Sequence, residues 1–211
     1  MSRRLLLILG LIGPSVSAQQ GRVRLDVTIP ANPAVEGPSV SVASVLSDGK
    51  TRELVQSGYT TRLTFRLELW RKGRWFDEPG DAVEEWNVLV SYDPAAKSYQ
   101  VLRQHGKETV HFGGLTSLDS AEALVDEPIK ATIHPSRSGR YYYNAALVVE
   151  ALSVSDLNAA FDWLRGPGKS AVSGKENPGS AFLKGLEVLA SRLIGGTQHQ
   201  QEHASGIFTV P

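Results

Sequence analysis

The segment from Tyr59 to Trp75, YTTRLTFRLELWRKGRW, decides the fold of this chain. From Leu63 to Leu69 an apolar side chain recurs at every second residue, and the residues between are mostly polar. Successive side chains of a strand point to opposite faces of a sheet, so this alternation predicts one long strand with a buried face and a wetter face. We expect the other elements to pack around this strand.

Alternating segments on both sides of this strand predict further strands, joined by turns rich in Gly, Pro, Asn and Asp. Short helices are expected at residues 48–56, where Asp48 caps the first turn and Gly58 follows the last, and at residues 117–126. The sequence therefore predicts a mainly β, α+β fold, with an antiparallel sandwich-like sheet flanked by a few helices. The expected strands are residues 22–29, 39–46, 83–92, 98–103, 108–112, 129–134 and 141–152.

The C-terminal part of the chain predicts two more helices. Apolar residues spaced by three and four indicate an amphipathic helix ending at Arg165 and a second one over Ser180–Ile194. The Gly-, Ser-, Lys- and Pro-rich segment between them has the composition of a flexible linker, and a solvated tail ends in Ile207–Val210, as a short strand or an anchor. The expected organisation is a signal peptide at 1–18, a β-rich domain at 19–166, a linker at 167–179, and an amphipathic helix and tail at 180–211.

The N-terminus has the three-part pattern of a secretory signal peptide. Arg3 and Arg4 precede the apolar run Leu5–Ile12, and small residues lead up to Ala18. We expect cleavage after Ala18. An uncleaved anchor is the alternative, which the pattern favours less because the run is shorter than the ~20 residues that a membrane span needs. No later segment of the sequence predicts a transmembrane helix.

Composition narrows the compartment and the class of partner. The chain has 211 residues, with 22 basic and 22 acidic side chains. This balance gives no electrostatic basis for binding nucleic acid. The chain has no cysteine, which excludes disulfides and a lipid anchor on an N-terminal cysteine. An exported chain of this kind fits a bacterial periplasmic or secreted protein.

The order of these elements resembles domain-of-unknown-function family 4390, a family of exported bacterial proteins. The resemblance covers about residues 22–166, and it implies export and a β-rich fold without implying a catalytic residue. The residues that carry it are Ser57-Gly58-Tyr59, Leu63 to Trp70, Trp75-Phe76-Asp77, Leu89 to Tyr92 with Tyr99-Gln100-Val101, Tyr141-Tyr142-Tyr143, and Leu157 to Leu164.

One segment matches a catalytic metal motif. His199-Gln200-Gln201-Glu202-His203 fits H-x-x-E-H, in which two histidines on one helical turn bind zinc and the glutamate activates water. The segment follows Gly195-Gly196, which disfavours a helix, and no later Asp or Glu could supply a third ligand. We therefore expect a solvated tail, and a zinc site formed by His199, Glu202 and His203 is the alternative.

Other polar clusters have a simple structural interpretation and a catalytic alternative. His105, His111 and His134 are expected at turns and strand ends, as isolated histidines rather than a metal site. An acidic cluster is expected to be a solvated hairpin loop, and calcium binding or acid/base chemistry is its alternative. The cluster contains Asp77, Glu78, Asp81, Glu84 and Glu85.

Aromatic residues near the end of the first long strand predict a binding surface. Trp70 falls on the polar face of its strand, and Trp75 and Phe76 follow just beyond the strand. For Trp70 itself, the favoured interpretation is that a neighbouring element covers the ring and pairs its indole N–H, and an exposed aromatic patch is the alternative. We expect an exported, non-catalytic module without a cofactor, which binds or scaffolds an unknown envelope protein or ligand. A metal-dependent hydrolase that uses the HQQEH segment or the acidic cluster is the rival.

Overall fold

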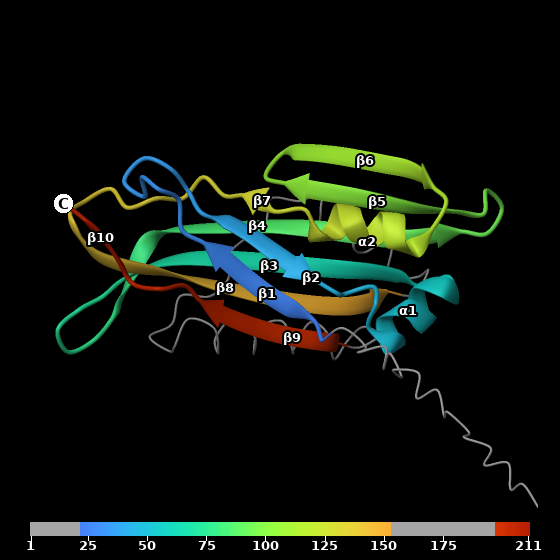
Figure 1. Cartoon of the computed structure of the whole chain (residues 1–211), viewed down its shortest axis with the longest axis horizontal. Coiled ribbons are helices and arrows are strands. Elements are labelled where there is room, and N and C mark those ends of the chain that lie inside the picture. The colour runs from blue at the N-terminus through green and yellow to red at the C-terminus, as the bar shows by residue number, and fades with distance from the viewer. Residues whose placement is uncertain (1–21, 153–196) are drawn as a thin grey trace, which may run out of the picture.

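The computed structural model describes residues 22–152 and 197–211 (Figure 1). The predicted signal peptide, the two C-terminal helices and the linker lie outside these ranges. Within them no helix is long and apolar enough to cross a membrane.

The described residues form two antiparallel sheets and two helices, which confirms the predicted mainly β fold. The large sheet has the strand order β10-β8-β3-β4-β5-β6, and β9 also pairs with β8. The small sheet has the order β1-β2-β7. The bounds are β1 (Arg24–Thr28), β2 (Ser39–Ala43), α1 (Gly49–Gln56), β3 (Thr60–Arg71), β4 (Glu78–Asp93), β5 (Ser98–His105), β6 (Glu108–Leu115), α2 (Leu118–Asp126), β7 (Ile129–Lys130), β8 (Gly139–Leu152), β9 (Thr197–Ala204) and β10 (Phe208–Val210).

The core lies between the small sheet and one face of the large sheet. Leu63, Phe65, Leu67 and Leu69 on β3 are all buried on this face, as the alternation predicts. The small sheet, α1 and α2 supply the other side of the same apolar cluster. Figure 1 shows β1 and β2 crossing in front of β3 and β8, with α1 at the right-hand end of the sheet and α2 beside β5. The buried residues of these covering elements include Leu25, Val27, Val40, Val42, Val55, Ala121 and Val125.

The opposite face of β3 is polar as predicted, but it is buried rather than wet. Arg62 and Glu150 are cross-strand partners, and Arg62 Nε donates to Glu150 Oε2 at 3.0 Å. Thr64 donates in the same way to its register partner Asn87, at 3.0 Å. These side chains hydrogen-bond to one another across the strands, which compensates their loss of water.

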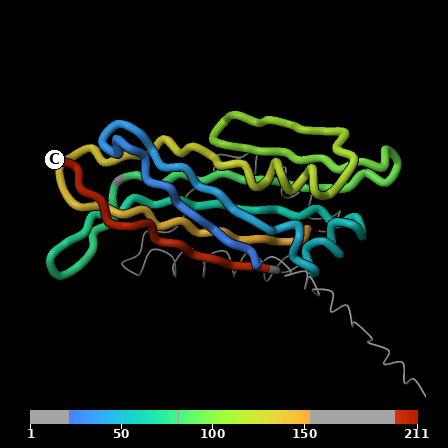
Figure 2. Tube along the Cα trace, in the orientation of Figure 1, coloured from blue at the N-terminus to red at the C-terminus, as the bar shows by residue number. Residues whose placement is uncertain are grey.

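The expectation of a solvated tail after residue 196 is wrong for the described part, because residues 197–204 form strand β9. This strand runs antiparallel to β8 over Asn144–Glu150, and β10 then pairs with Gly139–Tyr141 on the same side of β8. Figure 2 shows the two segments following β8 one after the other. The ring of Phe208 stacks on Tyr143 at 5.2 Å, and Val210 is buried. The tail is therefore part of the fold.

Candidate functional site

The loop between β3 and β4 presents the two most exposed large apolar side chains of the described chain. Trp75 is 81% exposed and Phe76 is 84% exposed. They are neighbours in the loop Lys72–Asp77, which we call the aromatic tip. Figure 1 shows this loop at the left, projecting beyond the body of the sheet. A pair of exposed aromatic rings on a projecting loop is a candidate contact surface.

The base of the aromatic tip is held by contacts with the neighbouring strand β8. Lys72 Nζ donates to Asp77 Oδ2 at 2.9 Å, and the Tyr142 hydroxyl donates to the same oxygen at 3.2 Å. The Lys72 backbone N–H also donates to the carbonyl of Arg140 at 2.8 Å. These bonds join the first and last residues of the loop and tie both of them to β8.

The ionisation of the groups at this base reflects the same contacts. The hydrogen bond from Lys72, with smaller help from its charge and from Tyr142, lowers the pKa of Asp77. Burial, followed by the negative charge of Asp77, raises the pKa of Tyr142 to about 12. At neutral pH Tyr142 therefore keeps its proton, and its hydroxyl donates a hydrogen bond to the ionised Asp77.

Two glycines allow the close backbone contacts of this hairpin. A Cβ on Gly73 would lie 1.8 Å from the carbonyl oxygen of Phe76, so the loop closes on itself at this position. A Cβ on Gly80 would lie 2.6 Å from the carbonyl oxygen of Leu69. The pairing of β3 with β4 is irregular between Glu68 and Trp70, which is where Gly80 approaches. The irregularity separates a short outer ladder, which carries the aromatic tip, from the main sheet.

Trp70 does not share the exposure of Trp75 and Phe76. It is only 8% exposed, and its indole N–H donates to Glu68 Oε2 at 3.0 Å. Its ring stacks on that of Tyr142, its register partner on β8, at 6.4 Å. The structure therefore separates the three predicted aromatic residues: Trp70 supports the hairpin, and Trp75 and Phe76 present a surface.

The HQQEH segment lies on a strand, so it lacks the geometry of a zincin helix. His199 and His203 pair in register with Val149 and Ala145, on the core face of the sheet, whereas Glu202 pairs with Ala146 and points to the opposite face. His199 Nε2 lies 3.0 Å from Asp48 Oδ2, and His203 Nε2 lies 3.6 Å from Asp26 Oδ1. The two histidines thus face separate carboxylates of the covering layer, and the glutamate is divided from both.

The remaining histidines and acids are also dispersed. His105 pairs with Glu84, whose second carboxylate oxygen accepts the backbone N–H of Thr132 at 2.7 Å. His111 contacts Gln100, and His134 contacts the Pro135 carbonyl. Among the described residues no group of three or more His, Cys, Asp and Glu could hold a metal ion. The expected solvated hairpin loop is wrong for most of the acidic cluster, because every member except Asp77 lies within β4. Asp77 and Glu84 both accept structural hydrogen bonds.

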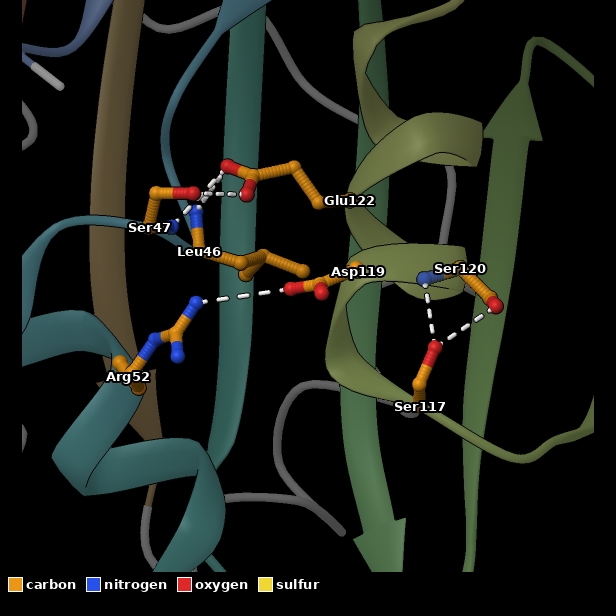
Figure 3. Close-up of polar contacts among 7 residues, drawn as sticks. All are labelled: Leu46, Ser47, Arg52, Ser117, Asp119, Ser120 and Glu122. Carbon is orange, nitrogen blue, oxygen red and sulfur yellow. Dashed lines mark hydrogen bonds and ion pairs between the residues drawn. The ribbon is translucent and has the colours of Figure 1, made fainter.

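A second polar constellation joins α2 to the segment before α1 (Figure 3). Glu122 Oε1 accepts the backbone N–H groups of Leu46 and Ser47, each at 3.0 Å. The Ser47 hydroxyl also contacts Glu122 Oε2. The carboxylate satisfies backbone donors of a loop, so this serine and glutamate fix the position of a connection and do not form a nucleophile–base pair.

Asp126 lies one helical turn after Glu122 on α2. Burial, together with the negative charge of Glu122, raises the pKa of Asp126 to about 6, and a backbone hydrogen bond from Ser44 opposes the shift. Ser44 itself has φ of 64°. The left-handed conformation at Ser44 turns the backbone between β2 and α1 toward the two carboxylates of α2.

No family model matches the chain, and no curated protein and no solved structure matches it significantly. The resemblance to domain-of-unknown-function family 4390 stays a prediction from the sequence.

Proposed function

We propose that this protein is an exported cell-envelope module without catalytic activity, which attaches to its partner through the aromatic tip. The observation that carries the proposal is the exposure of Trp75 and Phe76 on a loop whose base is fixed. Exposed aromatic side chains are costly in water and provide much of the binding free energy when they are buried at an interface.

The construction of the hairpin supports binding because it fixes the loop before any contact is made. Lys72, Asp77 and Tyr142 hold both ends of the loop through direct hydrogen bonds. Trp70 fills the space beneath it against Tyr142. A preformed loop loses less conformational entropy on binding than a loop that must first become ordered.

The predicted signal segment supports export, and the chemistry of the polar residues supports a role without catalysis. Three of the described histidines, His105, His199 and His203, each contact a different carboxylate. The HQQEH segment divides its histidines from its glutamate across the two faces of a sheet. The alternative of a metal-dependent hydrolase is thus left without an assembled site in this part of the chain.

Fractionation of cells that express the tagged full chain tests the proposal. We expect the wild-type protein to remain with the envelope fraction, and the double variant Trp75→Ala/Phe76→Ala to be released into the soluble fraction. Val110→Ala is the matched control, because Val110 is 49% exposed on β6, outside the aromatic tip. It should distribute like the wild type.

Unchanged folding of the double variant must accompany this result, and circular dichroism and thermal unfolding measure it. If the folded double variant stays with the envelope as the wild type does, attachment through the aromatic tip is wrong. Recovery of the wild-type chain in the cytoplasm would contradict the envelope location.

A further inference from the structure

We propose that the partner of the aromatic tip is the headgroup region of an anionic phospholipid bilayer, into which Trp75 and Phe76 insert. This inference rests on the proposed attachment through the tip and names the partner. Three observations carry it: the shape of the site, the distribution of charge around it, and the position of one arginine beside the indole.

The shape of the site favours a partner that surrounds it. Trp75 and Phe76 stand at the end of a projecting loop, with more than four fifths of each side chain in solvent (Figure 1). A projecting pair of rings encloses no ligand, so the partner itself must cover the rings. A bilayer interface does this without needing a matching cavity, and tryptophan is enriched at that depth because its ring is apolar and its N–H is polar.

The carboxylate of the loop itself is neutralised within the hairpin. Asp77 is paired with Lys72 at 2.9 Å, and the ladder between β3 and β4 places Arg71 opposite Glu78. The Asp77 carboxylate at the base of the loop is therefore already paired when the loop approaches an anionic surface. An unpaired carboxylate at the base would instead repel anionic headgroups.

Arg74 is the cation of the loop that lies outside the Lys72–Asp77 pair. Its guanidinium carbon lies 5.6 Å from the centre of the Trp75 ring, in cation–π contact. An arginine beside an interfacial tryptophan can bind a phosphate group while the indole enters the layer below it. The loop thus offers apolar rings and one positive charge at the same end.

Vesicle binding by the chain that begins at Gln19 tests the proposal, since this chain lacks the apolar N-terminal run that would bind lipid by itself. Co-sedimentation is measured with vesicles of phosphatidylcholine alone and of phosphatidylcholine with phosphatidylglycerol. We expect the wild type to bind the anionic vesicles, and Trp75→Ala/Phe76→Ala to bind at least about tenfold more weakly.

Two further variants separate the contributions. Arg74→Gln should weaken binding to anionic vesicles about fivefold and leave binding to neutral vesicles unchanged. Val35→Ala, at an exposed apolar residue outside the aromatic tip, should bind as the wild type does. Brominated lipid should quench tryptophan fluorescence in the wild type and quench much less when Trp75 is replaced by Phe.

Failure of the lipid proposal can be distinguished from failure of the proposed function. If the wild type does not bind either vesicle, or if the double variant binds as well as the wild type, the bilayer is not the partner. Retention in the envelope that depends on the aromatic tip, combined with no vesicle binding, would overturn the lipid proposal in favour of a protein partner and keep the proposed function. If the chain is found in the cytoplasm and still binds vesicles through the aromatic tip, the proposed envelope function is wrong and the lipid contact of the tip is kept.

Discussion

At the scale of single residues, Trp70 and Trp75 show how neighbouring aromatic residues take different roles. Trp70 lies within β3, where the register places it beside Tyr142 and its indole N–H reaches Glu68. Trp75 lies beyond the strand, where its ring contacts the guanidinium group of Arg74. The first residue stabilises the hairpin, and the second is exposed by it.

These different roles predict that substitution by alanine changes the free energy of unfolding by different amounts at Trp70 and Trp75. Trp70→Ala should lower the free energy of unfolding by about 3–5 kcal/mol, because it removes a buried aromatic ring and leaves the Glu68 carboxylate without one donor. Trp75→Ala should change it by no more than about 0.5 kcal/mol, as is usual for an exposed side chain. Chemical denaturation of both variants measures the difference. Equal costs would mean that Trp75 also supports the fold.

Asp126 predicts a stability change with pH whose sign follows from its raised pKa. The pKa is about 6 in the folded protein, against 3.8 for the free side chain, so folding favours the protonated acid. The corresponding stability is fully present below 3.8 and is lost as the pH rises through about 6. Asp126→Asn, which cannot ionise, should unfold at a higher temperature than the wild type above this range.

Below that range the melting temperatures of Asp126→Asn and the wild type should converge. Val35→Ala is the control, because Val35 is 64% exposed and carries no ionisable group. The difference in melting temperature between this control variant and the wild type should not change over the same pH range. A constant difference for Asp126→Asn would show that folding does not raise the pKa of Asp126.

Sequence reasoning could identify the exposed aromatic residues but not their support. Trp75 and Phe76 follow a strand and precede a turn, which is a local signal. The contacts of Tyr142 with Trp70 and Asp77 depend on the register between β3 and β8, in which Trp70 and its partner Tyr142 are about 70 residues apart in the chain. Three consecutive tyrosines at the start of a long strand were the available signal, and nothing local indicates which of them reaches the hairpin.

At the scale of elements, strand β9 is the main difference between prediction and structure. Its sequence, TQHQQEHA, is polar throughout, so hydrophobic alternation does not identify it. The strand forms because β8 offers a free side, and because its core-facing residues meet polar groups of the covering layer. His199 contacts Asp48, and Gln201 donates to the Val23 carbonyl. A polar strand of this kind is specified by distant partners.

Removal of residues 197–211 should therefore destabilise the fold strongly. The truncated chain would lose the partners of β8 over Gly139–Tyr141 and Asn144–Glu150 and expose the backbone groups that they satisfy. We expect a loss of more than about 3 kcal/mol, with aggregation through the exposed side of β8. Thermal unfolding and light scattering measure these effects.

Deletion of Pro211 alone is the control for this truncation. Pro211 is exposed and lies after β10, so its removal should change neither the melting temperature nor the light scattering. A chain truncated at residue 196 that is as stable as the wild type would show that β9 and β10 contribute nothing to the core. That outcome would support the solvated tail that the sequence predicts.

At the scale of the whole molecule, the class of fold follows from local patterns, but the arrangement of the sheets does not. Alternation indicates β3 and β8, and the capping residues Asp48 and Ser117 indicate the two short helices. The placement of β8 between β3 and β9, and the separation of β1, β2 and β7 into a second sheet, are set by contacts across long stretches of chain. In this arrangement one apolar face of β3 is buried in a cluster that includes residues of the small sheet.

The shared core predicts that the two sheets unfold together. Val40 on β2 is 2% exposed and belongs to the same apolar cluster as Leu63 and Trp86 of the large sheet. Val40→Ala should therefore lower the unfolding free energy by about 2–3 kcal/mol while keeping a single transition. The control Val35→Ala, at a residue that is 64% exposed, should cost less than about 0.5 kcal/mol. Far-ultraviolet circular dichroism reports the strands, and near-ultraviolet circular dichroism reports the packing of aromatic side chains, which include the buried Trp86. The two should give the same midpoint, because loosening the small sheet uncovers the shared core. Two separated transitions in Val40→Ala would show instead that the small sheet is an independent unit.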